Sequence, residues 1–236
     1  MKIKAFLIGV LNYLLLAGGA FGQNYIPPQA HTFKDTIRAE IDMYFNNIPN
    51  YNYIPALIEH ESCISLKHKR CWNSTSRLKS AREEGAGLGQ ITRAYNADGS
   101  LRFDSLYELR TRYKKELKDA AWETIYSRPD VQIRMIILMS RDNYNKLYDV
   151  PEPMEKLAMA DAAYNGGMGG LQKGRRLCSL KQGCDSTIWF NHVEKIVVKS
   201  TKPIYGDRSP DDINKYHVKD VLRSRMPKYE RVGYFN

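Results

Sequence analysis

Residues 56–62 read Ala56-Leu57-Ile58-Glu59-His60-Glu61-Ser62, and residues 85–92 read Gly85-Ala86-Gly87-Leu88-Gly89-Gln90-Ile91-Thr92. The first segment predicts a helix, since Pro55 suits a first helical turn. Leu57 and Ile58 precede Glu61 by four and three residues and so share its face. A carboxylate among aliphatic side chains is partly desolvated, and desolvation favours the protonated form that a general acid needs. The neighbouring Glu59 and His60 are expected to point elsewhere, with His60 exposed.

The second segment predicts a glycine turn that leads into a helix or strand. Glycine permits positive φ angles and the close approach of another chain, and the Gln90 amide both donates and accepts hydrogen bonds. A third segment, Ala162-Ala163-Tyr164-Asn165-Gly166-Gly167, predicts a helix that ends at the glycines with a tyrosine one turn before its end. Asp161, three residues before that tyrosine, is expected to face solvent.

These three segments, in this order, resemble the soluble-lytic-transglycosylase family, relatives of goose-type lysozyme. The resemblance spans residues 53–198 and is carried by Glu61-Ser62, Gly87-Leu88-Gly89-Gln90-Ile91 and Ala163-Tyr164-Asn165-Gly166-Gly167. It implies a mainly α, single lysozyme-like domain with a groove between helical lobes. A small β patch is expected within residues 86–103. The Lys-, Arg- and Ser-rich insert that follows Glu61 is longer than the family's usual link, which leaves the shape of one groove wall open.

The activity that the resemblance implies is lytic transglycosylation of peptidoglycan. Glu61 would protonate the glycosidic oxygen between N-acetylmuramic acid and N-acetylglucosamine, and would then accept the C6 hydroxyl proton as a 1,6-anhydro ring closes. No water, metal or cofactor takes part, and one carboxylate suffices where most glycosidases need two. The residues expected to bind the substrate or support the site are Ser62, Gln90, Tyr164, Asn165 and Glu194. Gln90 and Tyr164 would hold the substrate by hydrogen bonds, and Ser62 would fix the end of its helix or touch Glu61. Asn165 would mainly end its helix, and Glu194 could be a further carboxylate of the site.

Two alternatives remain open. A lysozyme-type muramidase with the same fold would need a second acid to position water, and Glu83, Glu84 or Asp98 could serve. A non-catalytic wall-binding module would carry Glu61 without using it. Peptidoglycan glycan strands are the expected partner in every case, and the protein is expected to be a monomer.

The chain of 236 residues fits one domain with extensions. Residues 1–22 form a positively charged, then apolar leader, either a signal peptide cleaved near Gly22 or a retained, releasable membrane anchor. Residues 23–52 are expected to be a helical extension, 53–200 the catalytic domain and 201–236 a C-terminal extension. The leader predicts export to the periplasm or cell envelope. The protein is expected to be either a phage lysis enzyme, which we favour, or a bacterial wall-remodelling enzyme.

The formal net charge of +10 suits an anionic partner. Basic residues are scattered and no nucleic-acid-binding signature is present, so a wall polymer is favoured over nucleic acid. Contact with a membrane is expected only through the leader. Four cysteines in an exported chain predict disulfides. Three pairings are possible, and the local one, Cys63–Cys71 with Cys178–Cys184, is favoured because each bond would close a loose loop; no closely spaced pair suggests zinc.

Apolar residues at helical spacing predict further helices, which begin at Thr32, Ser105, Asp130, Met154, Ile188 and Asp211. The helix from Asp130 is apolar around much of its circumference and is expected to be the central buried one. The last helix is expected to end near Arg223.

Overall fold

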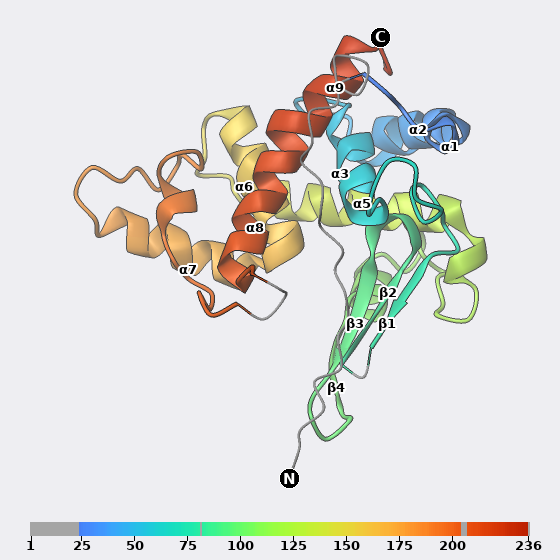
Figure 1. Cartoon of the computed structure of the whole chain (residues 1–236), viewed down its shortest axis with the longest axis horizontal. Helices are drawn as coiled ribbons and strands as arrows, with labels where there is room; N and C mark the ends of the chain where they lie inside the picture. The colour runs from blue at the N-terminus through green and yellow to red at the C-terminus, as the bar shows by residue number, and fades with distance from the viewer. Residues whose placement is uncertain (1–23, 81, 204–206, 236) are drawn as a thin grey trace.

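A computed structural model describes residues 24–80, 82–203 and 207–235 of the chain; the predicted leader, 1–22, lies outside them. The fold is mainly α with a small antiparallel sheet, which confirms the predicted class (Figure 1). The elements are α1 Pro28–Thr32, α2 Lys34–Tyr44, α3 Tyr53–Ser62, β1 Arg77–Lys79, β2 Glu83–Ala86, η1 Gly87–Gly89, β3 Ile91–Tyr95, β4 Leu101–Asp104, α4 Ser105–Arg112, η2 Ile125–Ser127, α5 Pro129–Asn145, α6 Pro153–Gly166, α7 Met168–Ser179, η3 Val193–Lys195, α8 Pro210–Lys219, η4 Asp220–Arg225 and α9 Met226–Arg231.

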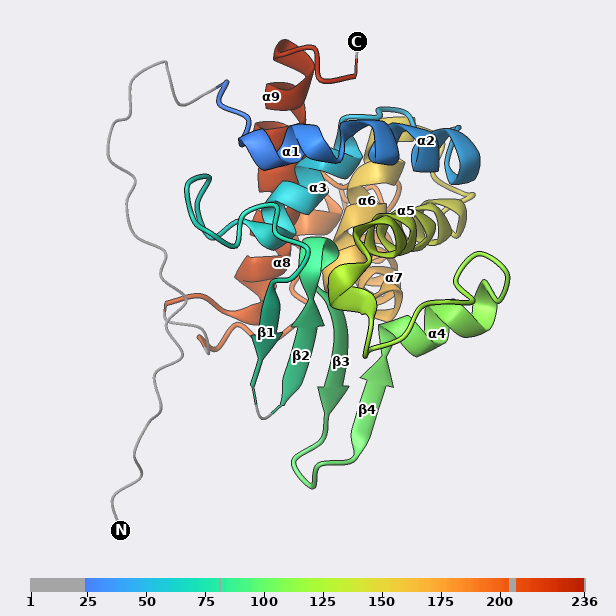
Figure 2. The same ribbon diagram turned by 90° about the vertical axis from the view of Figure 1, so that its right-hand side faces the viewer.

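Helix α5 lies in the centre of the molecule, as its sequence predicts. Residues 135–138 are fully buried, and the helix packs against α2, α6 and the η1 turn (Figure 2). Arg134, on the side of α5 that meets α2, forms an ion pair with Glu40. The N-terminal helices therefore share one hydrophobic core with α3, α5 and α6.

The sheet is larger than the sequence indicated. Four antiparallel strands pair in the order β1-β2-β3-β4, and β1 and most of β2 precede residues 86–103, within which the β patch was expected. The glycine-rich η1 is the turn that joins β2 to β3. Gly87 has a φ of 59°, and a Cβ there would lie 2.0 Å from the Gln132 amide oxygen, which accepts a hydrogen bond from the Leu88 N–H. Glycine is therefore required at this position.

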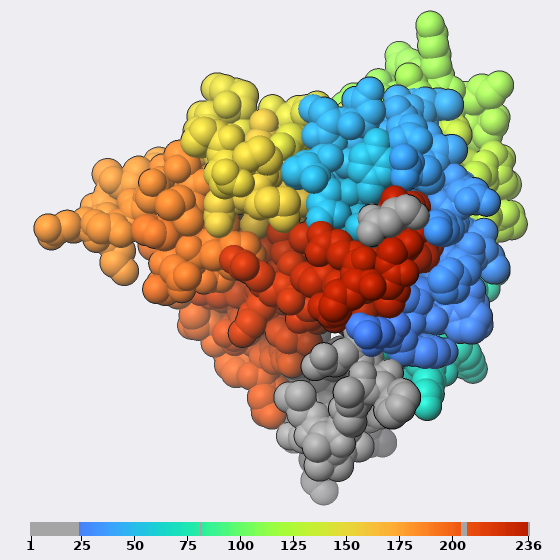
Figure 3. All heavy atoms as spheres, turned by 90° about the horizontal axis from the view of Figure 1, so that it is seen from above, coloured from blue at the N-terminus to red at the C-terminus, as the bar shows by residue number. Residues whose placement is uncertain are grey.

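The C-terminal segment forms an almost continuous helical rod through α8, the π-helical η4 and α9, and so extends beyond the predicted end at Arg223. Its start is fixed by a capping box between Ser209 and Asp212. Val218, Val221 and Tyr229 are fully buried. Figure 3 shows the rod between the N-terminal helices and the segment that follows α6. Helices α3 and α6 both pack against it.

The prediction of a helix over residues 188–198 is wrong. This segment turns repeatedly and contains only the short η3, with Asn191 in the left-handed region at a φ of 66°. The apolar residues that suggested a helix, Trp189 and Val193, are buried against the core in an irregular segment. Conversely, α7 was not predicted, because three glycines in its sequence weaken helical propensity.

Both favoured disulfides, Cys63–Cys71 and Cys178–Cys184, are present. The first closes the loop directly after α3, and the second closes the turn after α7. No helix in the ranges that the structure describes has the length and apolarity needed to cross a membrane.

Candidate active site

Glu61 lies in the last turn of α3, with its side chain 17% exposed. Leu57 and Ile58, on the same face, are fully buried, as the spacing predicted. The Oε1 atom of Glu61 lies 2.8 Å from Nε2 of His217 on α8. Its Oε2 atom takes no hydrogen bond from any residue that the structure describes. One carboxylate oxygen is thus held by the protein, and the other has no hydrogen-bond partner among the described residues.

His217 continues into a buried chain of hydrogen bonds. Its Nδ1 lies 2.8 Å from Oδ2 of Asp161 on α6, and the Tyr53 hydroxyl donates to Oδ1 of Asp161 at 3.0 Å. The His217 ring is 1% exposed and Asp161 is fully buried. Glu61, His217, Asp161 and Tyr53, which we call the Glu61 chain, therefore run from the surface into the core. They join α3, α8 and α6.

The charge of this chain is set by its histidine. Burial lowers the pKa of His217, but the charges of Asp161 and Glu61 and their hydrogen bonds outweigh burial and raise the pKa to about 10. The ring is an imidazolium near neutral pH. Burial, followed by the charge of Asp161, raises the pKa of Tyr53 well above its usual value, so this phenol stays a neutral donor.

The three sequence motifs meet beside this chain. The Tyr164 hydroxyl donates to the Gly89 carbonyl at 2.9 Å, which ties the end of α6 to the glycine turn. Burial and then the charge of Glu61 raise the pKa of the Tyr164 phenol, so the phenol lies within the field of the carboxylate. A Cβ at Gly89 would lie 2.8 Å from the Tyr164 oxygen and 2.3 Å from Ile136. The absence of a side chain at Gly89 permits this contact.

Gln90 and Asn165 border the same region. Gln90 has a left-handed backbone, φ 45°, and its side chain folds back so that Nε2 donates to the Gly87 carbonyl at 2.9 Å. The residue as a whole is half-buried. Asn165 is also half-buried, in the last turn of α6 before the cap at Gly167.

Two residues of the expected site, Ser62 and Glu194, form hydrogen bonds within the protein. Ser62 is buried. Its hydroxyl donates to the Ile58 carbonyl at 2.7 Å and accepts from the backbone N–H of Trp72 at 3.1 Å. The side chain therefore supports the end of α3. Glu194 accepts a hydrogen bond from the Asn191 N–H within its own turn. We therefore remove both from the set of substrate contacts.

Two further expectations are corrected. Asp161 faces the core rather than solvent, because His217 and Tyr53 occupy its oxygens. His60 is half-buried rather than exposed, with its side chain 18% exposed. Its ring lies 4.2 Å from the His217 ring and its Nδ1 lies 2.7 Å from Oδ2 of Asp220. His217 itself carried no sequence signal. The Asp161 signal was present, since the residues around it in α6 are almost all Ala, Met and Leu.

Glu59, two residues before Glu61, belongs to a second cluster. Its oxygens accept hydrogen bonds from Arg225 at 2.7 Å, Lys228 at 2.5 and 2.7 Å, and Tyr229 at 2.8 Å. Arg225 also donates to Asp220, whose pKa falls to about 2 because His60 and Arg225 outweigh the opposing effect of burial. Glu59 is 1% exposed. This cluster fixes the C-terminal rod to α3.

Of the three alternative second acids, Glu84 is engaged in ion pairs and Asp98 is remote from the helices. Glu84 is 2% exposed and is held by Arg77, Arg93 and the Tyr126 hydroxyl; these outweigh burial and lower its pKa to about 2. Asp98 lies in the β3–β4 turn, at the tip of the sheet farthest from the helices (Figures 1 and 2), where its carboxylate accepts from Ser100. Glu83 is part of strand β2.

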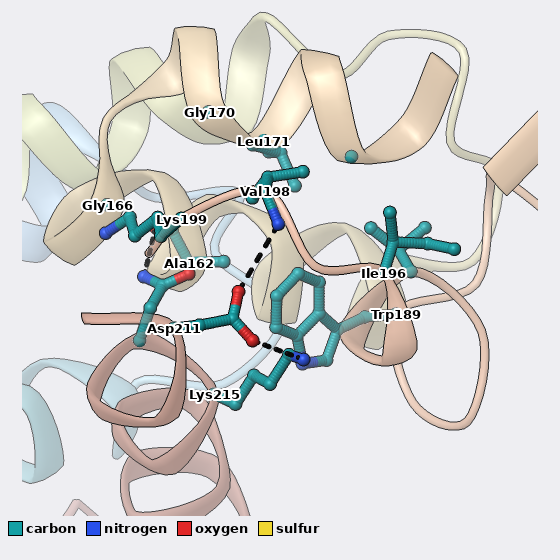
Figure 4. A pocket seen from close by; sticks show the side chains of 13 residues that line it. Ala162, Gly166, Gly170, Leu171, Trp189, Ile196, Val198, Lys199, Asp211 and Lys215 are labelled. Carbon is teal, nitrogen blue, oxygen red and sulfur yellow. Dashed lines mark hydrogen bonds and ion pairs between the residues drawn. The ribbon is translucent and has the colours of Figure 1, made fainter. Parts of the chain in front are cut away.

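A small cavity lies between α6, α7 and α8 (Figure 4). It measures about 20 Å³, room for a single water molecule, and is lined by apolar side chains with Asp211, Lys199 and Lys215 at one side. The Trp189 indole N–H in this region is buried without a hydrogen-bond partner. The cavity is too small for a sugar. Among the residues that the structure describes, no three or more His, Cys, Asp or Glu side chains converge as metal ligands.

Comparison with known proteins adds no relative to this picture: no family model matches the sequence, and no curated protein is significantly similar to it.

Proposed function

We propose that this protein is a peptidoglycan lytic transglycosylase in which Glu61 serves as both general acid and general base. Glycan strands of N-acetylmuramic acid and N-acetylglucosamine are its proposed substrate. The observation that carries the proposal is the position of Glu61: a partly exposed carboxylate with one free oxygen, next to a glycine turn and a phenol from distant parts of the chain.

The reaction assigns one role to each exposed group. The Glu61 proton passes to the glycosidic oxygen as the bond to the muramoyl C1 breaks, and the substrate's N-acetyl group stabilises the positive charge on that ring. Glu61 then accepts the C6 hydroxyl proton while the C6 oxygen bonds to C1. Gln90 and Asn165, both half-buried residues, are the proposed hydrogen-bonding contacts to the sugar. Tyr164 shapes the site through its bond to Gly89.

The surroundings of Glu61 favour this reaction over hydrolysis. Water-using glycosidases place a second carboxylate opposite the acid. Asp161 is the nearest carboxylate along the Glu61 chain, but it is fully buried and both its oxygens are occupied. Glu84 forms ion pairs with Arg77 and Arg93, and Asp98 lies at the tip of the sheet. None of the three is placed to activate water beside Glu61.

The proposed location is the periplasm or cell envelope. Two disulfides are compatible with an oxidising compartment, because such bonds are rare in reducing cytosol. The net charge of +10 would favour adsorption to an anionic wall.

The chemistry of the new chain ends tests the proposal. Purified peptidoglycan is digested and then treated with borohydride, which reduces the free ends left by hydrolysis but leaves 1,6-anhydro ends unchanged. We expect solubilised fragments whose muramoyl ends resist reduction. Reducible ends would assign the protein to the muramidases. Sedimentation with the wall without any release of fragments would assign it to the wall-binding modules.

A further inference from the structure

His217 reaches Glu61 from the C-terminal rod, outside the three motifs. Each of its ring nitrogens faces a carboxylate oxygen at 2.8 Å, Asp161 on one side and Glu61 on the other. Oδ2 of Asp161 can only accept a hydrogen bond, and so can Oε1 of Glu61 when the acid's proton is on Oε2, so a ring that bonds to both carries two protons. The geometry therefore calls for an imidazolium that donates to Glu61 through Nε2.

Asp161 and Tyr53 fix the His217 ring in this orientation. Asp161 is fully buried, and the Tyr53 hydroxyl holds its other oxygen at 3.0 Å. Rotation of the His217 ring would break two hydrogen bonds inside the core, where unpaired polar groups are costly. Donation to Oε1 then leaves Oε2 of Glu61 as the oxygen that can exchange a proton with a sugar.

Other titratable groups surround the pair. Tyr53 and His60 come from α3, Asp161 and Tyr164 from α6, and Tyr216 and Asp220 from the C-terminal rod. The His60 ring is 4.2 Å from His217, yet its Nδ1 is directed at Asp220, which Arg225 also holds. The carboxyl end of α3, at Glu61, carries partial negative charge. His217 is therefore the cation that the structure places in contact with Glu61.

We propose that His217, oriented by Asp161, is a positioning residue for the Glu61 acid: it holds Oε1 and so directs Oε2 to carry the catalytic proton. This inference rests on the proposed function. In the forward step the Oε2–H bond breaks and the proton leaves with the glycosidic oxygen. In the second step Oε2 takes the proton of the C6 hydroxyl. His217 gains and loses no net proton, and its charge stabilises the ionised Glu61 that exists between the steps.

The test compares pH profiles of the initial rate of wall clearing for the wild type, His217→Gln and Asp161→Asn, with His60→Gln as the matched control. His217→Gln should lower the rate at the wild-type optimum by about 10- to 100-fold. It should also move the alkaline limb of the profile to higher pH, because the cation in contact with Oε1 of Glu61 is lost. Asp161→Asn should move the limb in the same direction. His60→Gln, which leaves the Glu61 contact intact, should keep the wild-type profile.

A merely structural role would scale the rate equally at all pH values. Profiles of His217→Gln and Asp161→Asn that superimpose on the wild type after scaling would overturn the proposal. A measurement on the wild-type protein is independent of both variants: the ring nitrogens of His217 are followed by NMR from pH 5 to 10 in the wild type and in Glu61→Gln. We expect a doubly protonated ring at pH 7 that loses its proton at a lower pH in Glu61→Gln. A ring that is neutral at pH 7 would overturn the proposal even if the protein clears wall. Wild-type protein that releases no wall fragments would instead contradict the proposed function.

Discussion

Glu59 and Glu61 lie two residues apart in α3 and are both joined to the C-terminal rod, yet their surroundings differ. Glu59 is 1% exposed and accepts four hydrogen bonds, from Arg225, Lys228 and Tyr229. Glu61 is 17% exposed and accepts one, from His217. Arginine and lysine keep their charge through the physiological range, whereas histidine is the side chain whose charge is most readily changed.

The difference indicates that Glu59 suits a structural role and that Glu61 suits acid–base chemistry. Both oxygens of Glu59 accept hydrogen bonds from the C-terminal rod, so this carboxylate suits the joining of two helices. The Glu61 side chain is partly exposed, and its Oε2 has no hydrogen-bond partner among the described residues. Its Oε1 accepts from one titratable side chain, His217. A general acid must release and regain a proton during each turnover. Only Glu61 of the two has the exposure and the free oxygen for that task.

The comparison predicts the largest effect for Glu61→Gln. The amide keeps the shape of the side chain but cannot donate the catalytic proton, so the rate of wall clearing should fall by about 10²- to 10⁴-fold. The midpoint of thermal unfolding should change little, because the position is partly exposed. Glu194→Gln is the matched control and should clear wall at the wild-type rate. Unchanged clearing by Glu61→Gln would place the acid elsewhere.

Glu59→Gln should act on stability instead. Loss of the charge leaves Lys228 and Arg225 buried with less compensation, and breaking a buried ion pair costs about 3–5 kcal/mol. Urea titration should show this loss in the free energy of unfolding. Glu108→Gln, at an exposed site, should stay within about 0.5 kcal/mol of the wild type. Under conditions where Glu59→Gln remains folded, it should retain wall clearing; loss of clearing by folded protein would erase the distinction between the two glutamates.

The histidine beside Glu61 should give stability a particular pH dependence. The folded-state pKa of His217 is raised from 6.5 to about 10, so its contribution is fully present below pH 6.5 and is lost as the pH rises towards 10. The expected loss is on the order of a few kcal/mol. Urea titrations at pH 6, 8 and 10 should show the wild type losing more stability than His217→Gln over this range. Parallel curves for the two proteins would contradict an imidazolium in the folded state.

Ser62→Ala should have the smallest of these effects. The substitution removes the acceptor of the buried Trp72 N–H, which costs about 1–3 kcal/mol of stability. Activity per folded molecule should stay close to that of the wild type, since the hydroxyl is engaged inside the protein. A large fall in clearing rate without a change in thermal midpoint would restore Ser62 to the substrate site.

The site was partly predictable from sequence, because several of its residues are positioned by neighbours in the same helix or turn. Leu57, Ile58 and Glu61 share a face by helical periodicity alone, and the glycines around Gly87 indicate a tight turn. The encounter of Tyr164 with Gly89 could be expected only through the family resemblance, since 75 residues separate them.

The contact of His217 with Glu61 could not be predicted in this way. Its contact with Glu61 spans 156 positions and depends on how the C-terminal rod packs, which local pattern does not specify. The helix predicted over 188–198 failed for a related reason: tertiary packing of Trp189 and Val193 overrides their spacing. Asp161, by contrast, could have been recognised as buried, because a lone carboxylate in an alanine-rich helix that enters the core needs an internal partner.

The central claim, that Glu61 cleaves glycan by acid–base catalysis without water, is tested most directly by fragment mass spectrometry. The same purified peptidoglycan is digested with the wild type and with Glu61→Gln, and the muramoyl ends are weighed. We predict that wild-type fragments are lighter than the hydrolysis product by one water molecule, and that such fragments are lost with Glu61→Gln. Wild-type fragments at the mass of the hydrolysed product, or anhydro fragments that persist in Glu61→Gln, would contradict the account.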